Sequence, residues 1–193
     1  MDKICGYPFQ EFLRMIESFH GSKSPGLVLG GIMVDYAVSE IPPGVLFDAI
    51  CETKACLPDA IQLFTPCSYG NGWLKVMDLG RFALSLYNKR SGEGVRVYVD
   101  PARLRDWSEI RNWLYKLKPK SEQDQELLIA EMKLAGRSVL GLRPIMVKPQ
   151  HVGKVGRGAI VDCAACGEPY PQKDGPICRA CLGESPYIEE VVH

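Results

Sequence analysis

The pattern of apolar and polar residues predicts two helices at the start of the chain. Residues 7–19 follow the i, i+3, i+4, i+7 spacing of an amphipathic helix. Its apolar positions are Phe9, Phe12, Leu13, Ile16 and Phe19. Ser24 and Pro25 are typical of an N-cap and a first helical residue, so a second helix is expected to continue through residues 27–38. Glycines weaken that helix, and we expect them to allow close approach of another backbone or of a bound group.

Alternating apolar residues later in the chain predict a sheet. Four strands are expected, over residues 45–50, 73–77, 81–86 and 95–99. A short helix over residues 57–64 lies between the first two strands, and a glycine-rich loop is expected to close a hairpin between the last two. These elements predict an α+β fold in which a mainly antiparallel sheet packs against helices.

Two longer apolar stripes follow the strands. Pro101 is expected to open a helix that runs to Leu117 and ends at Pro119, and a further helix is expected over residues 122–137. Such stripes usually pack in a core. Part of this surface is also a candidate for a dimer contact.

The composition changes after these helices. Residues 136–157 are rich in proline and glycine and carry basic residues without acidic ones. We therefore expect an α+β domain over residues 1–138 and a linker over residues 139–158 that contains an extended piece near Pro144. A small zinc-binding domain is expected over residues 159–193.

The strongest single motif is a pair of CxxC knuckles near the end of the chain. Cys163 and Cys166 form the first and Cys178 and Cys181 the second, with eleven residues between them. Four thiolates close a tetrahedron around Zn²⁺, so we expect one structural zinc ion per chain in a treble-clef or zinc-ribbon-like domain. A redox dithiol and iron–sulfur ligation are the alternatives. A closed site leaves no open coordination position, so this zinc is not expected to be catalytic.

Charge and hydropathy narrow the classes of function. The 193-residue chain carries 23 basic and 23 acidic residues, so no overall field favours nucleic acid or an anionic membrane. Residues 162–193 carry six acidic groups against two basic ones, which disfavours a contact with phosphate backbones. The apolar runs are shorter than the roughly 18 residues of a membrane span. The first residues resemble an amphipathic helix and not a signal peptide, so we expect none. We expect a cytoplasmic protein, in which cysteines are typically metal ligands or functional thiols.

Three residues outside the tail are candidates for chemistry. Cys56 precedes the helix over residues 57–64, whose free N–H groups and partial positive charge would favour its thiolate. Cys67 follows the same helix, and both thiols could instead be small buried apolar groups. His20 ends the first helix and could be a metal ligand, a general base or a cation that complements the helix dipole. Its place before a glycine-rich helix start favours a role beside a bound anion.

Five short motifs occur in a fixed order along the chain. They are Phe19-His20-Gly21, Ser24-Pro25-Gly26-Leu27-Val28-Leu29-Gly30, Cys56-Leu57-Pro58-Asp59-Ala60-Ile61-Gln62, Cys67-Ser68-Tyr69-Gly70-Asn71-Gly72 and Asp78-Leu79-Gly80-Arg81. With these motifs the chain resembles the FmdE family of formylmethanofuran dehydrogenase-associated proteins over nearly its whole length, since some members also end in a four-cysteine zinc tail. The resemblance implies an α+β homodimer, a cleft with His20, Cys56 and Cys67, and zinc tails that can be exchanged between the two protomers.

The chain departs from the family pattern inside this cleft. The usual motif is His-Gly-His-x-Cys-Pro-Gly, whereas Ser22 stands here in place of the second histidine and Ser24 in place of the cysteine. Serine is a poor ligand for zinc or iron beside imidazole or thiolate. A second metal in the cleft would have His20, Cys56 and Cys67 as its three ligands, if the geometry allows.

Two functions of different classes follow. The first is a dimeric zinc protein associated with formylmethanofuran dehydrogenase-type tungsten or molybdenum one-carbon metabolism, with a cleft that binds a ligand or metal. In a catalytic version, Cys56 or Cys67 would be nucleophile, redox thiol or ligand, and His20 a base or further ligand. The second is a non-catalytic adaptor or regulator whose zinc tail contacts other proteins, the tungsten or molybdenum enzyme among them. Regulation through nucleic acid is disfavoured by the charge balance.

Overall fold

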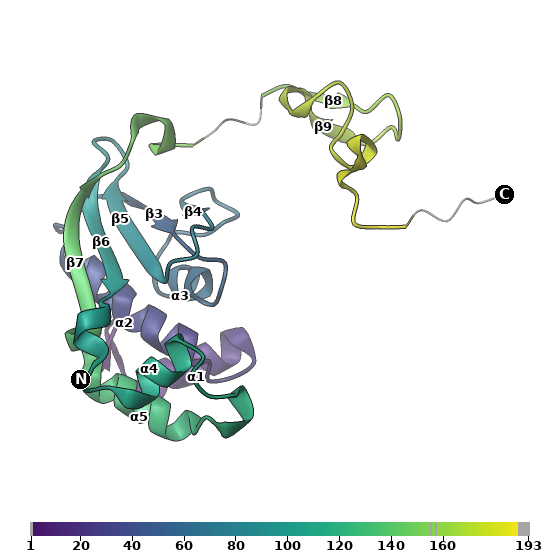
Figure 1. The fold of residues 1–193 in the computed structure, drawn as a ribbon. Helices are drawn as coiled ribbons and strands as arrows, with labels where there is room; N and C mark the ends of the chain where they lie inside the picture. The colour runs from purple at the N-terminus through teal and green to yellow at the C-terminus, as the bar shows by residue number, and fades with distance from the viewer. Residues whose placement is uncertain (1, 155, 157, 189–193) are drawn as a thin grey trace. The chain divides into compact units, whose positions relative to one another are not determined.

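The computed structural model describes residues 2–154, 156 and 158–188, and the chain divides into two compact units, Met1–Gly153 and Lys154–His193 (Figure 1). Among the described residues, no helix is long and apolar enough to cross a membrane. Arg157 of the expected linker lies outside the described residues. So do residues 189–193 of the expected zinc domain, which include two of its six acidic groups.

The first unit is built on a five-stranded sheet with the strand order β4-β3-β5-β6-β7. β3 and β4 pair in parallel, and the other neighbours are antiparallel. The strands are β3 (Phe47–Cys51), β4 (Leu74–Val76), β5 (Ala83–Asn88), β6 (Glu93–Val99) and β7 (Leu140–Met146), and a short hairpin of β1 (Lys3–Ile4) and β2 (Tyr7–Pro8) precedes them. The strands predicted from alternation are present, and the expected α+β class is confirmed.

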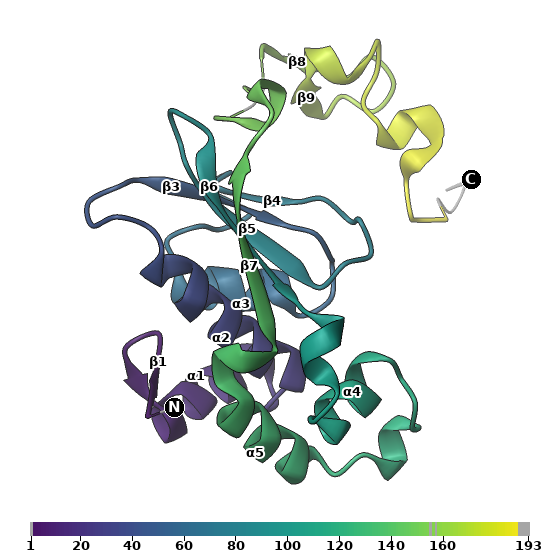
Figure 2. The same cartoon turned by 60° about the vertical axis from the view of Figure 1, so that its left-hand side comes forward.

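The helices of the first unit lie on one face of the sheet (Figure 2). They are α1 (Phe9–His20), α2 (Pro25–Ser39), α3 (Leu57–Phe64), α4 (Ser108–Leu114) and α5 (Gln125–Ala135). α2 is the central helix, because residues on all its sides are buried. A Cβ atom on Gly30 would lie only 2.7 Å from the Cβ of Ala60, so this glycine lets α3 pack closely against α2. The glycine-rich pattern therefore serves helix packing here.

The linker begins later in the chain than residue 139, the start expected from composition. Residues 140–146 form β7, which pairs with β6 from Glu93 to Val99. Pro144 fits because β7 is an edge strand, where a missing N–H leaves no ladder partner unpaired. The chain stays attached as far as Gly153, since Lys75 Nζ donates hydrogen bonds to its carbonyl oxygen at 2.7 Å and to that of His151. Composition alone could not distinguish an edge strand from a linker.

The single long helix expected from Pro101 to Leu117 is wrong. Pro101–Leu104 forms a short 3₁₀ helix, capped by the side chain of Asp100, and α4 begins only at Ser108. Between them Trp107 has φ −121° and ψ 77°, outside the helical region, so the chain changes direction. Leu104 and Ile110 are both buried, although they belong to two separate helical segments. Their apolar side chains therefore gave the sequence the spacing of one continuous helix.

The second unit is small. β8 (Ile160–Asp162) and β9 (Pro169–Pro171) form an antiparallel hairpin, and single helical turns follow at Gln172–Asp174 and Ala180–Glu184. Tyr170 is its one described residue, apart from a cysteine, that is a buried hydrophobic. A unit with so little apolar core depends on a further source of folding energy.

Candidate functional site

The four cysteines of the second unit meet at one point. The Sγ atoms of Cys163, Cys166, Cys178 and Cys181 all lie within 4.8 Å of one another. The sulfurs of Cys166 and Cys178 are 3.8 Å apart, which matches the separation of about 3.8 Å between two thiolates on a tetrahedral zinc with 2.3 Å Zn–S bonds. The four residues therefore have the spacing that a zinc ion requires.

Backbone groups prepare this cluster for ligation. The N–H of Cys178 donates to Cys163 Sγ at 3.4 Å, and hydrogen bonds from this and neighbouring amides lower the pKa of the Cys163 thiol to about 6. Gly167, with φ 76°, closes the first knuckle through a 2.8 Å bond from its N–H to the carbonyl of Cys163. These contacts favour the thiolate that a metal needs.

Cys56 stands at the N-cap of α3 in an unusual backbone conformation, with φ 50° and ψ −38°. Its sulfur lies 3.6 Å from the Oγ of Ser24, which is the N-cap of α2 and is itself buried. A Cβ on Gly26 would lie 2.7 Å from the Cβ of Cys56, so this glycine is what allows the two helix ends to meet. A strained non-glycine residue that is held by packing is a frequent feature of functional sites.

A second polar pair links α1 to the same end of α3. His20 Nδ1 lies 3.0 Å from Asp59 Oδ2, and both side chains are about one third exposed, at 31% and 35%. Asp59 is in the first turn of α3, three residues after Cys56, so the two residues lie on neighbouring positions of one helical turn. The carboxylate orients the imidazole and can share its proton.

From the sequence, Asp59 was named only as part of the motif over residues 56–62. The one signal that could have singled it out was its i+3 spacing from Cys56. Its contact with His20 crosses 39 residues and depends on how α1 packs against α3.

Cys67 does not join this cluster. It follows the C-terminal end of α3, whereas Cys56 precedes the N-terminal end, and an eight-residue helix is about 12 Å long. Cys67 is fully buried with its sulfur 3.6 Å from the carbonyl of Phe47, and burial raises the pKa of its thiol to about 11. The structure therefore pairs His20 with Asp59 and Ser24 with Cys56 at the N-terminal end of α3, and Cys67 belongs to neither pair.

The Cys-Ser-Tyr-Gly-Asn-Gly motif builds a loop. Asn71 Oδ1 accepts hydrogen bonds from the N–H groups of Ser68 and Trp73 at 3.1 and 2.9 Å, and its Nδ2 donates to the carbonyl of Pro66 at 2.8 Å. Gln62 Oε1 accepts from the N–H of Tyr69 at 3.1 Å. These contacts account for the asparagine and glutamine of the motif by loop structure, without a ligand.

Glu52 anchors the segment that leads from β3 to Cys56. Glu52 is 5% exposed, and its carboxylate accepts two hydrogen bonds from Arg96, at 2.6 and 2.7 Å. Arg81 Nε lies 2.8 Å from the same carboxylate. The hydrogen bond and charge of Arg96 hold the pKa of Glu52 below its usual value. This pair fixes the C-terminal end of β3, from which the chain continues to the strained residue Cys56.

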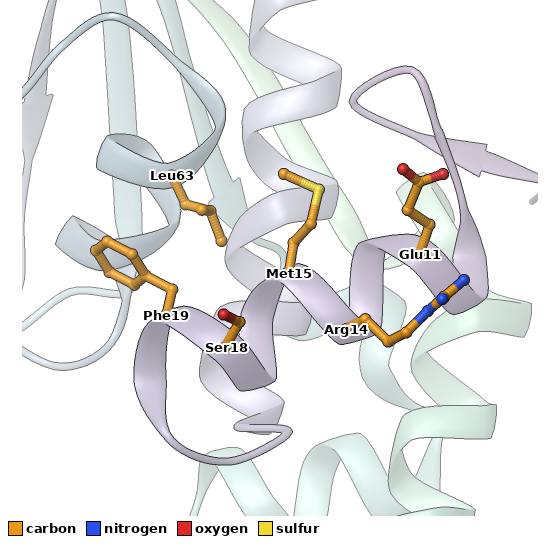
Figure 3. A pocket seen from close by; sticks show the side chains of 6 residues that line it. All are labelled: Glu11, Arg14, Met15, Ser18, Phe19 and Leu63. Carbon is orange, nitrogen blue, oxygen red and sulfur yellow. The ribbon is translucent and has the colours of Figure 1, made fainter.

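A shallow groove of about 470 Å³ lies between α1 and α3 (Figure 3). Met15 and Phe19 of α1 and Leu63 of α3 supply its apolar surface, and Glu11 and Arg14 lie at its other end. Phe19 directly precedes His20, and Leu63 is one turn after Asp59 on the same side of α3. The apolar wall of the groove is therefore made by residues that are close to His20 and Asp59 along the same two helices.

Metal ligation is not preformed in this cluster. Within the described residues, only the four tail cysteines bring three or more cysteine, histidine or carboxylate ligand atoms within 4.8 Å of one another. His20, Asp59 and Cys56 can still supply donors of three kinds to a ligand. What the arrangement offers as it stands is a thiol with a hydroxyl neighbour, beside an imidazole–carboxylate pair.

Two family models match the chain. The model described as "FmdE, Molybdenum formylmethanofuran dehydrogenase operon" matches residues 19–145, and the "FmdE treble clef zinc finger" matches residues 154–188. The second match covers all four clustered cysteines. Together with the sulfur spacing it supports a structural zinc in a treble-clef tail.

A solved structure and a curated protein are similar to the chain. The crystal structure of a tungsten formylmethanofuran dehydrogenase FmdE-like protein from Syntrophus aciditrophicus is 49% identical, with a TM-score of 0.89, over 96% of this chain and 98% of that one. A probable S-adenosyl-L-methionine-binding protein of Archaeoglobus fulgidus is 30% identical over 89% of this chain. This chain spans 52% of that protein, about half of its length.

Proposed function

We propose, because the chain belongs to the FmdE family and carries that family's treble-clef zinc finger, that it is an accessory protein of formylmethanofuran dehydrogenase-type tungsten or molybdenum one-carbon metabolism that binds a ligand at Cys56. The observation that carries the ligand site is the meeting of Ser24 and Cys56, 3.6 Å apart, beside the His20–Asp59 pair. The tail zinc has a structural role in this proposal.

Two kinds of ligand fit the donors at this site. A thiol, an imidazole and a carboxylate are ligands for a borderline or soft metal ion, which would have to draw them closer together. An organic ligand would instead use them as hydrogen-bonding groups and place an apolar part on Met15, Phe19 and Leu63. S-adenosyl-L-methionine is the first organic ligand to test, since it is named in the description of the Archaeoglobus fulgidus relative.

The deciding experiment compares the purified full chain with Cys56→Ser and Cys67→Ser variants. Metal per chain is measured by mass spectrometry, and S-adenosyl-L-methionine binding by calorimetry. A second metal, or bound S-adenosyl-L-methionine, that is lost in Cys56→Ser but kept in Cys67→Ser supports the site. One zinc in all three proteins, with no binding that depends on Cys56, contradicts it.

An adaptor is the second candidate function, and exposed apolar residues of the zinc unit favour it. Leu182, Tyr187 and Ile188 are 48%, 80% and 97% exposed, which is unusual for large apolar side chains on a small unit. The test is co-purification with the component chains of the tungsten or molybdenum enzyme. Binding that is lost in a Tyr187→Ser/Ile188→Ser double variant and kept in Cys56→Ser supports the adaptor, and the reverse pattern supports the ligand site.

A cytoplasmic location belongs to the same proposal. A four-thiolate zinc site needs reduced cysteines, and the cytoplasm keeps thiols reduced. Fractionation of the source cells, with immunodetection of the chain, tests this location directly.

A further inference from the structure

The last segment of the first unit lies over the face of the sheet opposite the helices. It follows β7 as residues 148–153, here called the strap. Val152 of the strap packs against a small apolar cluster with Ile50 and Tyr87, which is separate from the main core. Ile50 and Tyr87 belong to β3 and β5, whose alternate residues face the helices, so this cluster lies on the opposite face. The strap therefore packs on the sheet itself.

Two side chains of the sheet fasten the strap. Lys75 Nζ donates to the carbonyl oxygen of Gly153 at 2.7 Å and to that of His151. Its third donor lies 3.1 Å from the hydroxyl oxygen of Tyr87, and that hydroxyl donates to the same carbonyl of His151 at 3.1 Å. An ammonium group has three protons, so this clamp uses the whole donor capacity of Lys75.

Within the described residues, the main chain of the strap makes no hydrogen bond to the sheet. The N–H groups of His151 and Val152 donate to carbonyls inside the strap, at 2.8 and 3.1 Å. The last main-chain bond to the sheet comes just before the strap, from Val147 to the carbonyl of Gly92 at 2.9 Å. The strap is therefore held by the side chains of the clamp and by the apolar contact of Val152.

The ammonium of the clamp is partly withdrawn from water. Burial lowers the pKa of Lys75, and the negative charge of Asp48, which is 2% exposed, opposes this shift. The carbonyl oxygens of the strap thus take the place of water around a desolvated charge. Loss of that charge would remove the reason for the strap to stay at this place on the sheet.

From these contacts we propose that residues 148–153 are a detachable strap, which Lys75 fastens and which sets the length of free chain that carries the zinc unit. With the strap fastened, the chain before β8 is free over residues 154–159, and with the strap released it is free over residues 148–159. Its contour length doubles, which adds at most about 20 Å of reach. The length of a tether sets the effective concentration at which the unit it carries meets a binding surface. The strap contains no residue of the Cys56 site, so this inference does not depend on the proposed ligand.

A lysine variant tests the clamp by hydrogen exchange of the full chain. Lys75→Met keeps an apolar stem and removes the ammonium, so the amides of His151 and Val152 should exchange about tenfold faster than in the wild type. The Val147 amide, which is bonded to the sheet, should keep its protection. Lys148→Met is the matched control, because Lys148 is an exposed lysine of the strap, and it should exchange like the wild type. Wild-type exchange of the strap in Lys75→Met would overturn the proposal.

A second variant leaves the sheet unchanged. Val152→Ser removes the apolar contact that the strap itself makes, and it should also speed exchange at His151. It keeps the test decisive where Lys75→Met loosens the sheet as a whole. If the strap stays fully protected in Val152→Ser, it is not detachable and the proposal fails.

Small-angle X-ray scattering of the zinc-loaded full chain tests the reach of the zinc unit. Lys75→Met should increase the maximum dimension of the protein by up to about 20 Å. A glycine–serine insertion of the strap's length after Gly153 is the matched control, because it lengthens the free chain while the strap stays fastened. The variant and the insertion should give similar scattering. If the insertion enlarges the protein and Lys75→Met does not, the strap does not set the length of the tether.

Discussion

The hydroxyl oxygen of Ser24 lies 3.6 Å from the sulfur of Cys56, although 32 residues separate them in the chain. The contact joins the N-terminal ends of α2 and α3, and both residues occupy N-cap positions. The position of Ser24 therefore controls what the Cys56 thiol can do. With a hydroxyl there, the sulfur has a hydrogen-bonding neighbour, and with a second thiol there it would have a partner in metal ligation.

Replacing Ser24 by cysteine should add a metal site. The two sulfurs would then lie near 3.6 Å, close to the separation of about 3.8 Å for two thiolates on one tetrahedral zinc. We expect one additional zinc per chain after equilibration with zinc and dialysis, measured by mass spectrometry. Ser39→Cys is the matched control, because Ser39 is exposed at the opposite end of α2. An unchanged metal content in Ser24→Cys would show that the helix ends do not hold the two sulfurs together.

Gly26→Ala should displace Cys56 and destabilise the fold. Alanine normally stabilises a helix interior by about 1 kcal/mol relative to glycine. Here the new Cβ would lie 2.7 Å from the Cβ of Cys56 and 2.9 Å from its sulfur, and such overpacking costs about 1–3 kcal/mol. Urea unfolding should show a net loss of stability. Gly70→Ala, where a Cβ meets nothing within 4 Å, should change the free energy of unfolding by less than about 0.5 kcal/mol.

The cysteine thiols of the first unit should differ in their rates of alkylation. Burial raises the pKa of Cys5 to about 12 and those of Cys51 and Cys67 to about 11, so at pH 8 about 0.1% or less of each is thiolate. Cys56 is only partly buried. In the folded, zinc-loaded protein we expect iodoacetamide to label Cys56 first, as read by peptide mass spectrometry, and all four thiols after denaturation. Equal labelling rates for Cys67 and Cys56 would contradict the assignment of Cys56 as the accessible thiol and Cys67 as the buried one.

Glu52→Gln should lower stability in a pH-dependent way. Arg96 holds the pKa of Glu52 below its usual value, so the unfolded chain binds a proton at this carboxyl more readily than the folded chain does. The stabilisation is therefore complete above the unfolded pKa of about 4.3 and is lost as the pH falls through the lower folded value. At pH 7 the variant leaves Arg96 buried without a counter-charge, which costs about 3–5 kcal/mol.

Urea unfolding at pH 7 and at pH 3 measures this difference. The difference in the free energy of unfolding between wild type and Glu52→Gln should become smaller at pH 3, because the wild-type carboxyl is then increasingly protonated in the unfolded chain. Glu122→Gln, at an exposed position, should unfold like the wild type at both pH values. If the difference in the free energy of unfolding is the same at both pH values, the Glu52–Arg96 contact contributes through packing and not through charge.

Removal of the zinc should unfold the second unit alone. A Cys181→Ser variant loses one of four ligands, and metal ligation contributes on the order of 10 kcal/mol to the folding of such sites. We expect the zinc content to fall from one ion per chain and proteolysis to cut within residues 154–188, while the first unit stays resistant. Cys56→Ser should keep the tail zinc. A protease-resistant tail without zinc would mean that the unit folds by its own core.

The local pattern of apolar residues was sufficient to predict most of the helices and strands. Apolar residues at helical spacing identified α1, α2, α3 and α5, and alternation identified the central strands, because these periods follow directly from backbone geometry. Two errors came from the same source. The stripe from Pro101 to Leu117 kept helical spacing through a turn, and Pro144 suggested a linker where an edge strand tolerates it.

The sequence by itself determined α1, α2, α3 and α5, the central strands and the four-cysteine zinc site, since each depends on residues close together in the chain. Only the tertiary structure decided the membership of the other site. The packing of α1 and α2 against α3 brings His20 to Asp59 and Ser24 to Cys56 across 39 and 32 residues. α3, which is about 12 Å long, separates Cys56 before its N-terminal end from Cys67 after its C-terminal end. Periodicity predicts which side of a helix is buried, but the contacts between helices depend on side-chain packing across the whole core.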